Sequence, residues 1–565
     1  MAAATVLSPG PPAPEARALS PADAAFIRRQ AGGLRSGDLL LLDLLHSLQE
    51  RFGFLPRDAL EALSAEARFP REQLFGTASF YANFRFSPPP RVVMKVCGSL
   101  SCHLAGCDAV RRAAEALGSG AEVRTVSCLG LCDEAPAMLL NGRPRGRVAP
   151  GGVARAVRRR DARAGPRLRG LADYRKAGGY RALARVRAEA TPGAVIAALK
   201  ESGLRGLGGA GFPAAAKWEA VLRAPGSPKY VVVNADEGEP GTFKDRFIME
   251  RDPHRLLEGA LIAAATVGAA EVWVYLREEY ARSRRVLGAA IRQATAAGLA
   301  AGPGPSPMKP RVRLAIGAGS YVCGEETALL ESMEGRRGEP RLRPPFPATR
   351  GLWGKPTLVS NVETLSLVPG VLEHGEVAAR LKLFSVSGDV VRPGIYEAPL
   401  GTTARELIFD LAGGPIPGTE VKAFVPGGVA TGFLPASKLD VPLEFSALAK
   451  EGSGLGSGGF IVLSDRRCTV DAAHNCLRFF AHESCGKCTP CRAGTEKMAG
   501  LLDRLCRLEP VEFGHFDDLA AVMADGSICG LGQTAPAPVM SGLKHFREEW
   551  GAHLRGVCPA GVCGR

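Results

Sequence analysis

The chain has 565 residues, a hydrophobic content of 46% and a formal net charge of +14 at pH 7. This length exceeds what one hydrophobic core supports, so we expect several domains. No apolar run reaches the roughly 18 to 20 residues that a membrane helix needs, and no signal peptide is recognisable. The arginines are scattered without interleaved aromatic residues, which argues against a nucleic-acid partner. We therefore expect a soluble, cytoplasmic protein whose fifteen cysteines stay reduced and bind metal where they cluster.

The N-terminal region predicts a small helical domain over residues 20–88. Residues 1–19 are rich in Pro and Ala and are interpreted as a disordered tail. Leucines then recur at helical spacing between Leu40 and Leu48, and a second helix is expected after Pro56.

A small α/β domain is predicted over residues 89–157, because strands near 92–96 and 123–126 flank a helix around 108–117. Each strand is followed at once by a cysteine pair, with C-x4-C and C-x3-C spacing. The four cysteines are Cys97, Cys102, Cys128 and Cys132. Two thiolate pairs at adjacent strand ends suit a [2Fe–2S] cluster, and a structural zinc site is the alternative. Cys107 is interpreted as structural, and the Arg-rich stretch 158–174 as a solvated linker.

A larger α/β domain is predicted over residues 175–378, and it contains a glycine loop. The loop has the pattern G-x-G-x-x-G, formed by Gly206, Gly208, Gly209 and Gly211. A helix that begins at Pro192, after Thr191 as its N-cap, precedes the loop where a Rossmann fingerprint has a strand. Backbone N–H groups of such a loop can still surround a phosphate, assisted by a helix that begins near Phe212.

Two further segments of this domain point to a nucleotide. The strand 230–234 leads into the acidic, glycine-bearing segment 236–241, and a third glycine loop spans residues 317–326. Ligands of open α/β sheets bind at such strand ends, where carboxylates can hold ribitol or ribose hydroxyl groups.

The C-terminal part predicts a β-rich domain over residues 379–450 and a helical domain over 451–550, followed by a tail over 551–565. Three cysteines with C-x2-C-x2-C spacing, Cys485, Cys488 and Cys491, predict a [4Fe–4S] cluster. Its fourth ligand is expected to be Cys529, which lies among glycines, in preference to Cys506 within a helix. The remaining cysteines are assigned no metal: Cys468 and Cys476 as structural residues, Cys558 and Cys563 as part of the tail.

Nucleotide loops beside two clusters imply a flavin as well as NAD(H). Nicotinamide transfers electrons in pairs as hydride, whereas iron–sulfur clusters accept one electron at a time, and a flavin can do both.

Together these motifs resemble the NADH-binding diaphorase module of respiratory complex I, NAD-reducing hydrogenases and NAD-dependent molybdenum or tungsten formate dehydrogenases. The segments that carry the resemblance are 206–213, 234–241, 324–326 and 483–491. Residues from about 20 to 157 resemble the small [2Fe–2S] subunit, and those from about 175 to 550 the flavoprotein subunit. The resemblance implies a multidomain α/β protein with a helical and a thioredoxin-like [2Fe–2S] domain, a Rossmann-like FMN and NAD domain, a β-grasp (SLBB-like) domain and a helical [4Fe–4S] domain.

The resemblance also implies which residues contact the cofactors. FMN would be held by Gly206, Gly208, Lys217, Asn234, Asp236, Glu237, Tyr321, Gly324, Glu325 and Asn361. NAD(H) would stack over the flavin and contact Phe212, Glu239, Glu326 and Phe346, and Gly209, Gly211, Arg343 and Thr364 complete the expected cofactor contacts. Glu239 and Glu326 are the candidate catalytic residues, although hydride transfer between nicotinamide and flavin requires no acid or base. The chain departs from the family at three positions. Ala220 stands where an aromatic residue is expected, Arg343 where Lys is usual, and Ser360 where the family has Asn. Arg343 keeps a charge that can bind phosphate.

The partner is expected to be a catalytic alpha subunit with a molybdenum or tungsten pterin centre and further iron–sulfur clusters, because we associate fusion of both modules in one chain with formate dehydrogenases. This chain would be the beta subunit and would not insert into a membrane. The NADH-dehydrogenase module of complex I, that of a hydrogenase and a non-enzymatic metal- and nucleotide-binding scaffold are the alternatives. The choice of metal, the direction of electron flow, the oligomeric state and the preference for NAD over NADP stay open.

Overall fold

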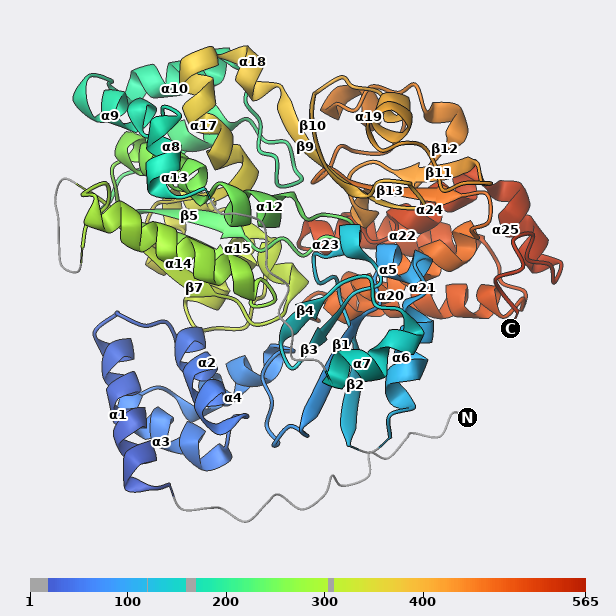
Figure 1. Cartoon of the computed structure of the whole chain (residues 1–565), viewed down its shortest axis with the longest axis horizontal. Coiled ribbons are helices and arrows are strands. Elements are labelled where there is room, and N and C mark those ends of the chain that lie inside the picture. The colour runs from blue at the N-terminus through green and yellow to red at the C-terminus, as the bar shows by residue number, and fades with distance from the viewer. Residues whose placement is uncertain (1–18, 119, 159–168, 303–308, 565) are drawn as a thin grey trace. The chain divides into compact units, whose positions relative to one another are not determined.

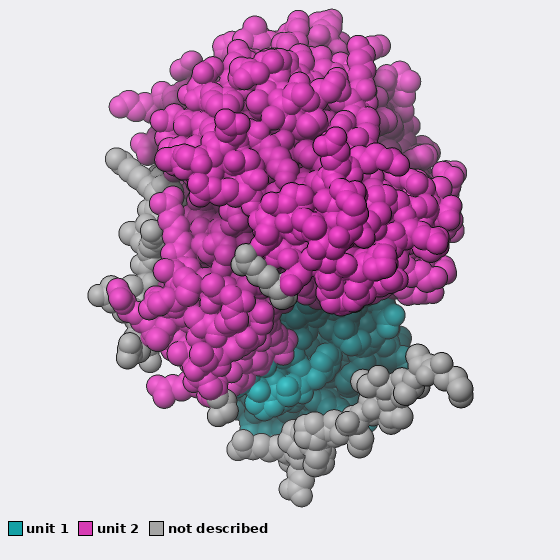
Figure 2. Space-filling model, turned by 90° about the vertical axis from the view of Figure 1, so that its right-hand side faces the viewer, with its two compact units in different colours: residues 1–89, 335–337 teal, residues 90–334, 338–565 magenta. Residues whose placement is uncertain are grey.

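The computed structural model describes residues 19–118, 120–158, 169–302 and 309–564, and it divides into two compact units (Figures 1 and 2). Unit 1 contains residues 1–89 and 335–337, and unit 2 contains the rest. The expected tail up to residue 18 and most of the expected linker, residues 159–168, lie outside the described residues. None of the described helices is long and apolar enough to cross a membrane.

The residues of unit 1 that the structure describes form four helices. They are α1 (Pro21–Arg35), α2 (Leu41–Phe52), α3 (Arg57–Ala67) and α4 (Arg71–Phe80). The leucines of α2 at helical spacing are fully buried, as expected from the sequence, and Gly53 ends this helix in a left-handed conformation with φ of 80°. The hydroxyl of Thr77 donates to the carbonyl of Gly335 at 3.0 Å, so the segment 335–337 packs within this unit.

The first part of unit 2 is a four-stranded sheet in the order β2-β1-β3-β4. Its elements are β1 (Val92–Cys97), α5 (Leu100–Leu104), α6 (Cys107–Glu115), β2 (Ala121–Val126), β3 (Met138–Leu140), β4 (Arg143–Arg145) and α7 (Val153–Arg158). β1 and β2 are parallel, with Cys97 opposite Val126, so the loops that follow the two strands begin side by side. This register brings the two predicted cysteine pairs together.

The second part of unit 2 is a parallel sheet in the order β7-β6-β5-β8. Its strands are β5 (Lys229–Ala235), β6 (Ala269–Leu276), β7 (Arg311–Ile316) and β8 (Thr357–Asn361). The helices are α8 (Leu171–Lys176), α9 (Arg181–Ala188), α10 (Pro192–Glu201), α11 (Ala214–Arg223), α12 (Lys244–Arg251), α13 (Pro253–Val267), α14 (Ala281–Ala296), α15 (Glu326–Met333), α16 (Pro347–Arg350), α17 (Val362–His374) and α18 (Glu376–Ala379). Helices α13 and α17 share a buried apolar cluster with Val231 and Val233 of β5.

The strand order of this sheet fixes where a ligand can bind. The chain proceeds from β5 outward to β6 and β7, and then returns to the other side of β5 as β8. The strand order therefore reverses between β5 and β8. In open α/β sheets, ligands bind at such a switch point, at the carboxyl ends of the strands. Asn234 and Asn361 lie opposite each other at these two ends.

The third part of unit 2 is a mixed sheet in the order β10-β9-β13-β11-β12. Its elements are β9 (Leu381–Gly388), β10 (Gly394–Pro399), the π-helical turn Glu406–Leu411, β11 (Val421–Val425), β12 (Leu434–Pro435), α19 (Phe445–Lys450) and β13 (Gly459–Ser464). The predicted boundary at residue 450 leaves out β13, whose six residues are all buried between β9 and β11. The sheet therefore extends to Ser464.

The C-terminal part consists of helices. They are α20 (Thr469–Glu483), α21 (Thr489–Cys506), α22 (Gly514–Gly526), α23 (Gly530–Thr534), α24 (Ala537–His545) and α25 (Arg547–Leu554). Cys506 is the last residue of α21 rather than an interior one. Residues 551–564 continue α25 and then form ordered turns, in contrast to the expected tail.

Candidate functional site

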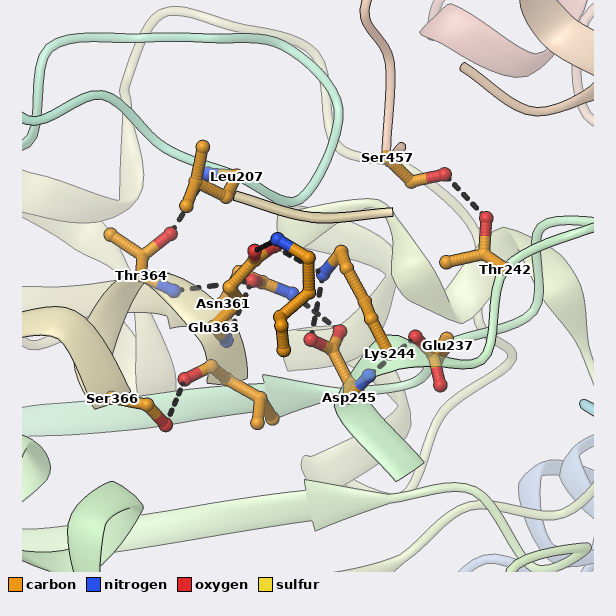
Figure 3. A network of polar contacts seen from close by, with 12 residues as sticks. Leu207, Glu237, Thr242, Lys244, Asp245, Asn361, Glu363, Thr364, Ser366 and Ser457 are labelled. Carbon is orange, nitrogen blue, oxygen red and sulfur yellow. Dashed lines mark hydrogen bonds and ion pairs between the residues drawn. The ribbon is translucent and has the colours of Figure 1, made fainter. Parts of the chain in front are cut away.

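The glycine loop lies at the switch point of the parallel sheet, between α10 and α11. The backbone N–H of Leu207 donates to the hydroxyl of Thr364 at 2.8 Å (Figure 3). A Cβ added to Gly208 would lie 3.1 Å from Cβ of Asn361, so a side chain there would push against β8. Thr191 caps α10 by accepting from the N–H of Ala194, as its sequence position predicts. The loop is thus held close to the ends of β5 and β8.

Asn361 links the loop to α12, the helix that follows the acidic segment. Its side-chain oxygen accepts from the N–H of Glu363 at 2.9 Å and caps α17, while its amide donates to Asp245 at 2.7 Å (Figure 3). Asn234, opposite it on β5, donates to the carbonyl of Gly324 at 2.8 Å. The second and third glycine-bearing segments therefore meet at the same edge of the sheet.

The carboxylates of the acidic segment differ in what they can bind. Both oxygens of Glu237 accept backbone N–H groups at the start of α12, at 2.7 Å and 3.0 Å, so this side chain stabilises the fold. Asp236 has a buried oxygen, Oδ2, without a hydrogen-bond partner among the described residues, and burial raises the pKa of Asp236 to about 8. A hydroxyl group of a ligand would satisfy that oxygen, which fits the ribityl chain of FMN.

Glu239 lies where the parallel sheet meets the mixed sheet. It accepts from the hydroxyl of Tyr321 and from the N–H of Ala430, the latter at 2.9 Å. Burial raises the pKa of Glu239 to about 7. Tyr321 packs edge-on against Phe479 of α20, with ring centroids 4.9 Å apart. This candidate catalytic residue is therefore surrounded by three parts of unit 2.

The other predicted charged residues gather on one side of the glycine loop. Lys217 donates to Glu326 at 2.6 Å and to the carbonyl of Val359 at 3.1 Å. Arg343 lies 3.8 Å from Glu325 and 3.9 Å from Glu326. Glu325 caps α15 by accepting from the N–H groups of Thr327 and Ala328. Glu326, Lys217 and Arg343 thus form a partly exposed charged group beside the loop, whereas Glu325 stabilises a helix.

Two aromatic side chains of the predicted NAD(H) site are exposed, Phe212 by 54% and Phe346 by 55%. Exposed rings next to this charged group offer flat apolar surfaces for a nucleotide. The region at the carboxyl ends of β5 and β8, beside the glycine loop and these side chains, is called the nucleotide crevice below. Of the departures from the family, Ala220 lies in α11 and Ser360 in β8, opposite Val233.

A buried group of two lysines and two carboxylates lies behind the crevice, and motif reasoning did not identify it. Lys244 donates to Asp245 at 2.7 Å and lies 3.1 Å from Glu363, which also accepts from Lys382 at 2.6 Å. All four side chains are at most 4% exposed. Burial disfavours the charge of Lys244, but Asp245 and Glu363 outweigh it and raise the pKa of Lys244; burial lowers the pKa of Lys382 to about 8.

The first cysteine set is assembled at the ends of β1 and β2. Cys97, Cys102, Cys128 and Cys132 are all buried, and the Sγ atoms of Cys128 and Cys132 are 3.4 Å apart. Contact with Cys102 raises the pKa of Cys97, and contact with Cys128 together with burial raises that of Cys132. Four crowded, buried thiols become thiolates only when a cationic centre neutralises them, so these residues fit a metal cluster.

The second cysteine set lines one pocket between the C-terminal helical part and the third glycine loop. Cys485, Cys488, Cys491 and Cys529 surround it together with Lys487 and Val322. A Cβ on Gly532 would lie 2.8 Å from Cβ of Cys491, so this glycine lets the Cys529 loop approach the other three cysteines. The pocket thus contains the predicted fourth ligand.

Two charged side chains whose contacts were not expected from the sequence join the three sites. Arg277 donates to the carbonyl of Cys128 at 2.7 Å and to the carbonyl of Glu237, so it connects a cysteine loop to the acidic segment. Glu483 accepts from Ser127 and, at 2.8 Å, from the N–H of Tyr321, and it lies two residues before Cys485. The nucleotide crevice therefore lies between the two cysteine sets.

Comparisons with known proteins agree with this arrangement. The chain matches four described families: the Nuo51 FMN-binding domain over residues 199–370, the NADH-ubiquinone oxidoreductase-F iron-sulfur binding region over 471–553, the thioredoxin-like [2Fe-2S] ferredoxin over 34–160 and the SLBB domain over 383–434. These matches confirm the predicted fold class and cofactors.

Individual relatives cover long stretches of the chain. The F 2 subunit of the NADH-quinone oxidoreductase of Rhizobium meliloti (strain 1021) is 46% identical, over 68% of this chain and 94% of its own length. The HndC subunit of the NADP-reducing hydrogenase of Solidesulfovibrio fructosivorans is 40% identical, over 69% of this chain and 82% of its own length. A chain from the crystal structure of an NAD+-reducing [NiFe]-hydrogenase in the H2-reduced state superposes with a TM-score of 0.80 and 34% identity, over 91% of this chain and 93% of that one.

Sequence identity, coverage and site geometry thus agree. The residues present fit FMN and NAD(H) at the switch point, a [2Fe–2S] cluster at the first cysteine set and a [4Fe–4S] cluster at the second. The chain is an NAD-dependent oxidoreductase subunit, and it belongs to the family of NADH-binding flavoprotein subunits represented by the F-type subunits of NADH-quinone oxidoreductases.

Proposed function

We propose that this chain is the beta subunit of an NAD+-reducing formate dehydrogenase, in which it passes electrons from a molybdenum- or tungsten-containing partner to NAD+. The observation that carries the diaphorase part is the position of the crevice between two cysteine sets, joined by Arg277 and Glu483. When bound, FMN supplies the conversion between the hydride of nicotinamide and the single electrons of the clusters.

In this proposal each part of the crevice has a defined role. The oxygen Oδ2 of Asp236 accepts from a ribityl hydroxyl, and the backbone N–H groups of the loop around Gly208 surround the phosphate. Phe212 and Phe346 stack against the dinucleotide, and Arg343 binds its phosphates. Glu239 and Glu326 orient the nicotinamide nucleotide through hydrogen bonds. None of these residues transfers a proton.

The diaphorase part is tested with the purified chain and the substitution Gly208→Ala. The added Cβ meets Asn361, so FMN content is expected to fall several-fold, and NADH-dependent reduction of ferricyanide is expected to fall in the same proportion. Gly193→Ala is the control, because its Cβ meets only Thr191 at 4.0 Å. Full activity in flavin-free protein would refute the assignment, and a chain that contains zinc without flavin would support the scaffold alternative.

The formate dehydrogenase assignment rests on the presence of both modules in one chain. The match with the solved hydrogenase chain covers 91% of the present chain and 93% of the hydrogenase chain. The same combination of modules therefore also occurs in a hydrogenase. The second candidate is therefore the corresponding subunit of an NAD+-reducing hydrogenase.

Elemental analysis of the complex purified from its host through a tag on this chain separates the candidates. Molybdenum or tungsten together with formate-dependent NAD+ reduction would support formate dehydrogenase. Nickel with hydrogen-dependent reduction would support the hydrogenase. Iron without molybdenum, tungsten or nickel would favour complex I or an iron-only hydrogenase and would overturn the formate assignment.

A further inference from the structure

The C-terminal part of unit 2 brings together four side chains that the flavin and cluster sites do not use. Cys468 precedes α20 as its N-cap, His553 lies in the last turn of α25, and Cys558 and Cys563 follow that helix. One ligand atom from each of the four lies within 4.8 Å of the other three. From the sequence, Cys468 is expected to be structural and Cys558 and Cys563 to belong to a tail, and no spacing motif connects all four residues.

The distances within this group fit a single metal ion. Sγ of Cys468 lies 3.3 Å from Nε2 of His553 and 3.8 Å from Sγ of Cys563. A tetrahedral zinc ion with Zn–S of about 2.3 Å and Zn–N of about 2.0 Å separates two sulfurs by about 3.8 Å, and a sulfur from a nitrogen by about 3.5 Å. The free side chains are thus already arranged along the edges of such a tetrahedron.

The imidazole of His553 is oriented as metal-binding histidines are. Its Nδ1 lies 2.8 Å from the carbonyl oxygen of Glu549, which can only accept, so Nδ1–H donates and Nε2 keeps its lone pair. Nε2 is the atom that faces Cys468. A backbone carbonyl that fixes the tautomer in this way is the usual outer partner of a zinc-binding histidine. The ring is fully buried, so it has no access to water as an alternative partner.

The compactness of the group separates it from the two cluster sites. In the part of the chain that the structure describes, this is the one group of three or more Cys, His, Asp or Glu whose ligand atoms all lie within 4.8 Å of one another. Neither iron–sulfur cysteine set meets that limit. A cluster distributes its ligands over several iron atoms, whereas a mononuclear ion draws them towards one point.

We propose that Cys468, His553, Cys558 and Cys563 bind a structural Zn²⁺ ion, separate from the two iron–sulfur clusters. Three thiolates and one imidazole form a closed ligand set with no position for a substrate. Cys558 and Cys563 lie on a turn in which the N–H of Gly561 donates to the carbonyl of Cys558, so both come from the last residues of the chain. The ion fastens these residues to the start of α20, whose other end is Glu483, next to the [4Fe–4S] loop.

The test measures zinc and iron per chain in the purified full-length protein and records X-ray absorption at the zinc edge. We expect about one zinc per chain that resists a mild chelator. Its ligand shell is expected to contain about three sulfurs at about 2.3 Å and one nitrogen at about 2.0 Å. Absence of zinc, or a shell of oxygen and nitrogen atoms, would overturn the proposal. So would a disulfide between Cys468 and Cys563, or an iron excess that indicates a third cluster.

Substitutions test the ligand set itself. Cys558→Ser and His553→Gln are each expected to lower the zinc content about tenfold while the iron and flavin contents stay unchanged. Cys107→Ser is the matched control, because this buried cysteine lies in the core of the thioredoxin-like domain. Cys506→Ser addresses a competing thiol, because the side chain of Cys506 is a hydrogen-bond partner of Cys563. Loss of zinc in Cys506→Ser with zinc retained in His553→Gln would show that the ligand set is wrong.

Discussion

At the scale of single residues, the carboxylates around the crevice divide into two groups. Both oxygens of Glu237 accept backbone N–H groups at the start of α12, and one oxygen of Glu325 does so at the start of α15. Both oxygens of Glu239 also accept hydrogen bonds within the protein, whereas Asp236 keeps Oδ2 without a partner among the described residues. Burial raises the pKa of both Asp236 and Glu239. A ligand hydroxyl group therefore finds its open acceptor at Asp236.

The raised pKa of Glu239 predicts a pH-dependent stability in the ligand-free chain. A carboxyl whose pKa is about 7 when folded and about 4.3 when unfolded binds its proton more tightly in the folded protein. Its contribution is therefore fully present below about pH 4 and is lost as the pH rises to about 7. Glu239→Gln imitates the protonated form, with an amide that donates to Tyr321 and an oxygen that accepts from Ala430.

We expect Glu239→Gln to match the unaltered chain at about pH 4 and to exceed its stability by about 2 to 4 kcal/mol at about pH 8. Thermal melting of both proteins in flavin-free form over this pH range measures the difference. A difference that is the same at both pH values would contradict the raised pKa.

At the scale of elements, Glu363 ties the parallel sheet to the mixed sheet. It lies in the first turn of α17 and accepts from Lys382 and from the N–H of Leu383, both in β9. Lys244 of α12 approaches the same carboxylate. Because all these groups are buried, removal of one charge leaves another unbalanced in a medium of low polarity.

Glu363→Gln is therefore expected to destabilise the protein strongly, by about 3 to 5 kcal/mol, since it leaves Lys382 without its carboxylate. The double substitution with Lys382→Met is expected to recover part of that loss, because the unbalanced charge is gone. Glu397→Gln on the exposed side of β10 serves as the control. Calorimetric unfolding measures the stability of the unaltered chain and of the three variants. A double variant less stable than the single one would mean that the lysine does not require its partner.

At the scale of the whole chain, the position of Arg277 links the nucleotide crevice to the [2Fe–2S] site. Its guanidinium donates to the carbonyl of Cys128, and its positive charge is buried next to the cluster ligands. Hydrogen bonds and charges around a cluster set its reduction potential.

Arg277→Met is expected to shift the potential of the [2Fe–2S] cluster negatively by some tens of millivolts, because the reduced and more negative cluster loses a cation beside it. Arg277→Lys is expected to restore part of the shift, and Arg392→Met, at an exposed position of the mixed-sheet domain, to cause none. Redox titration followed by electron paramagnetic resonance measures the potential of each cluster separately. A shift confined to the [4Fe–4S] cluster would contradict the assignment.

Local patterns in the sequence predicted much of the cluster chemistry, because the cysteine spacings and the glycine loop lie in short segments. Contacts between distant segments were not predictable in this way. Arg277 and Glu483 are single charged residues whose partners lie about 40 to 360 positions away. β13 is a short apolar run that becomes a strand only because β9 and β11 flank it. His553 is one histidine on a helix, and only the fold brings three cysteines to it.

The segment 335–337 has a consequence for the order in which the chain is made. Its carbonyl groups at Gly335 and Arg336 accept from Thr77 and Tyr81, and its backbone packs against Leu41, so unit 1 is assembled from two stretches of sequence that lie far apart. A ribosome completes the four helices about 250 residues before it completes this segment. During that interval the hydroxyl groups of Thr77 and Tyr81 and the side chain of Leu41 are without these contacts, so unit 1 gains its final packing only after the second stretch has been made.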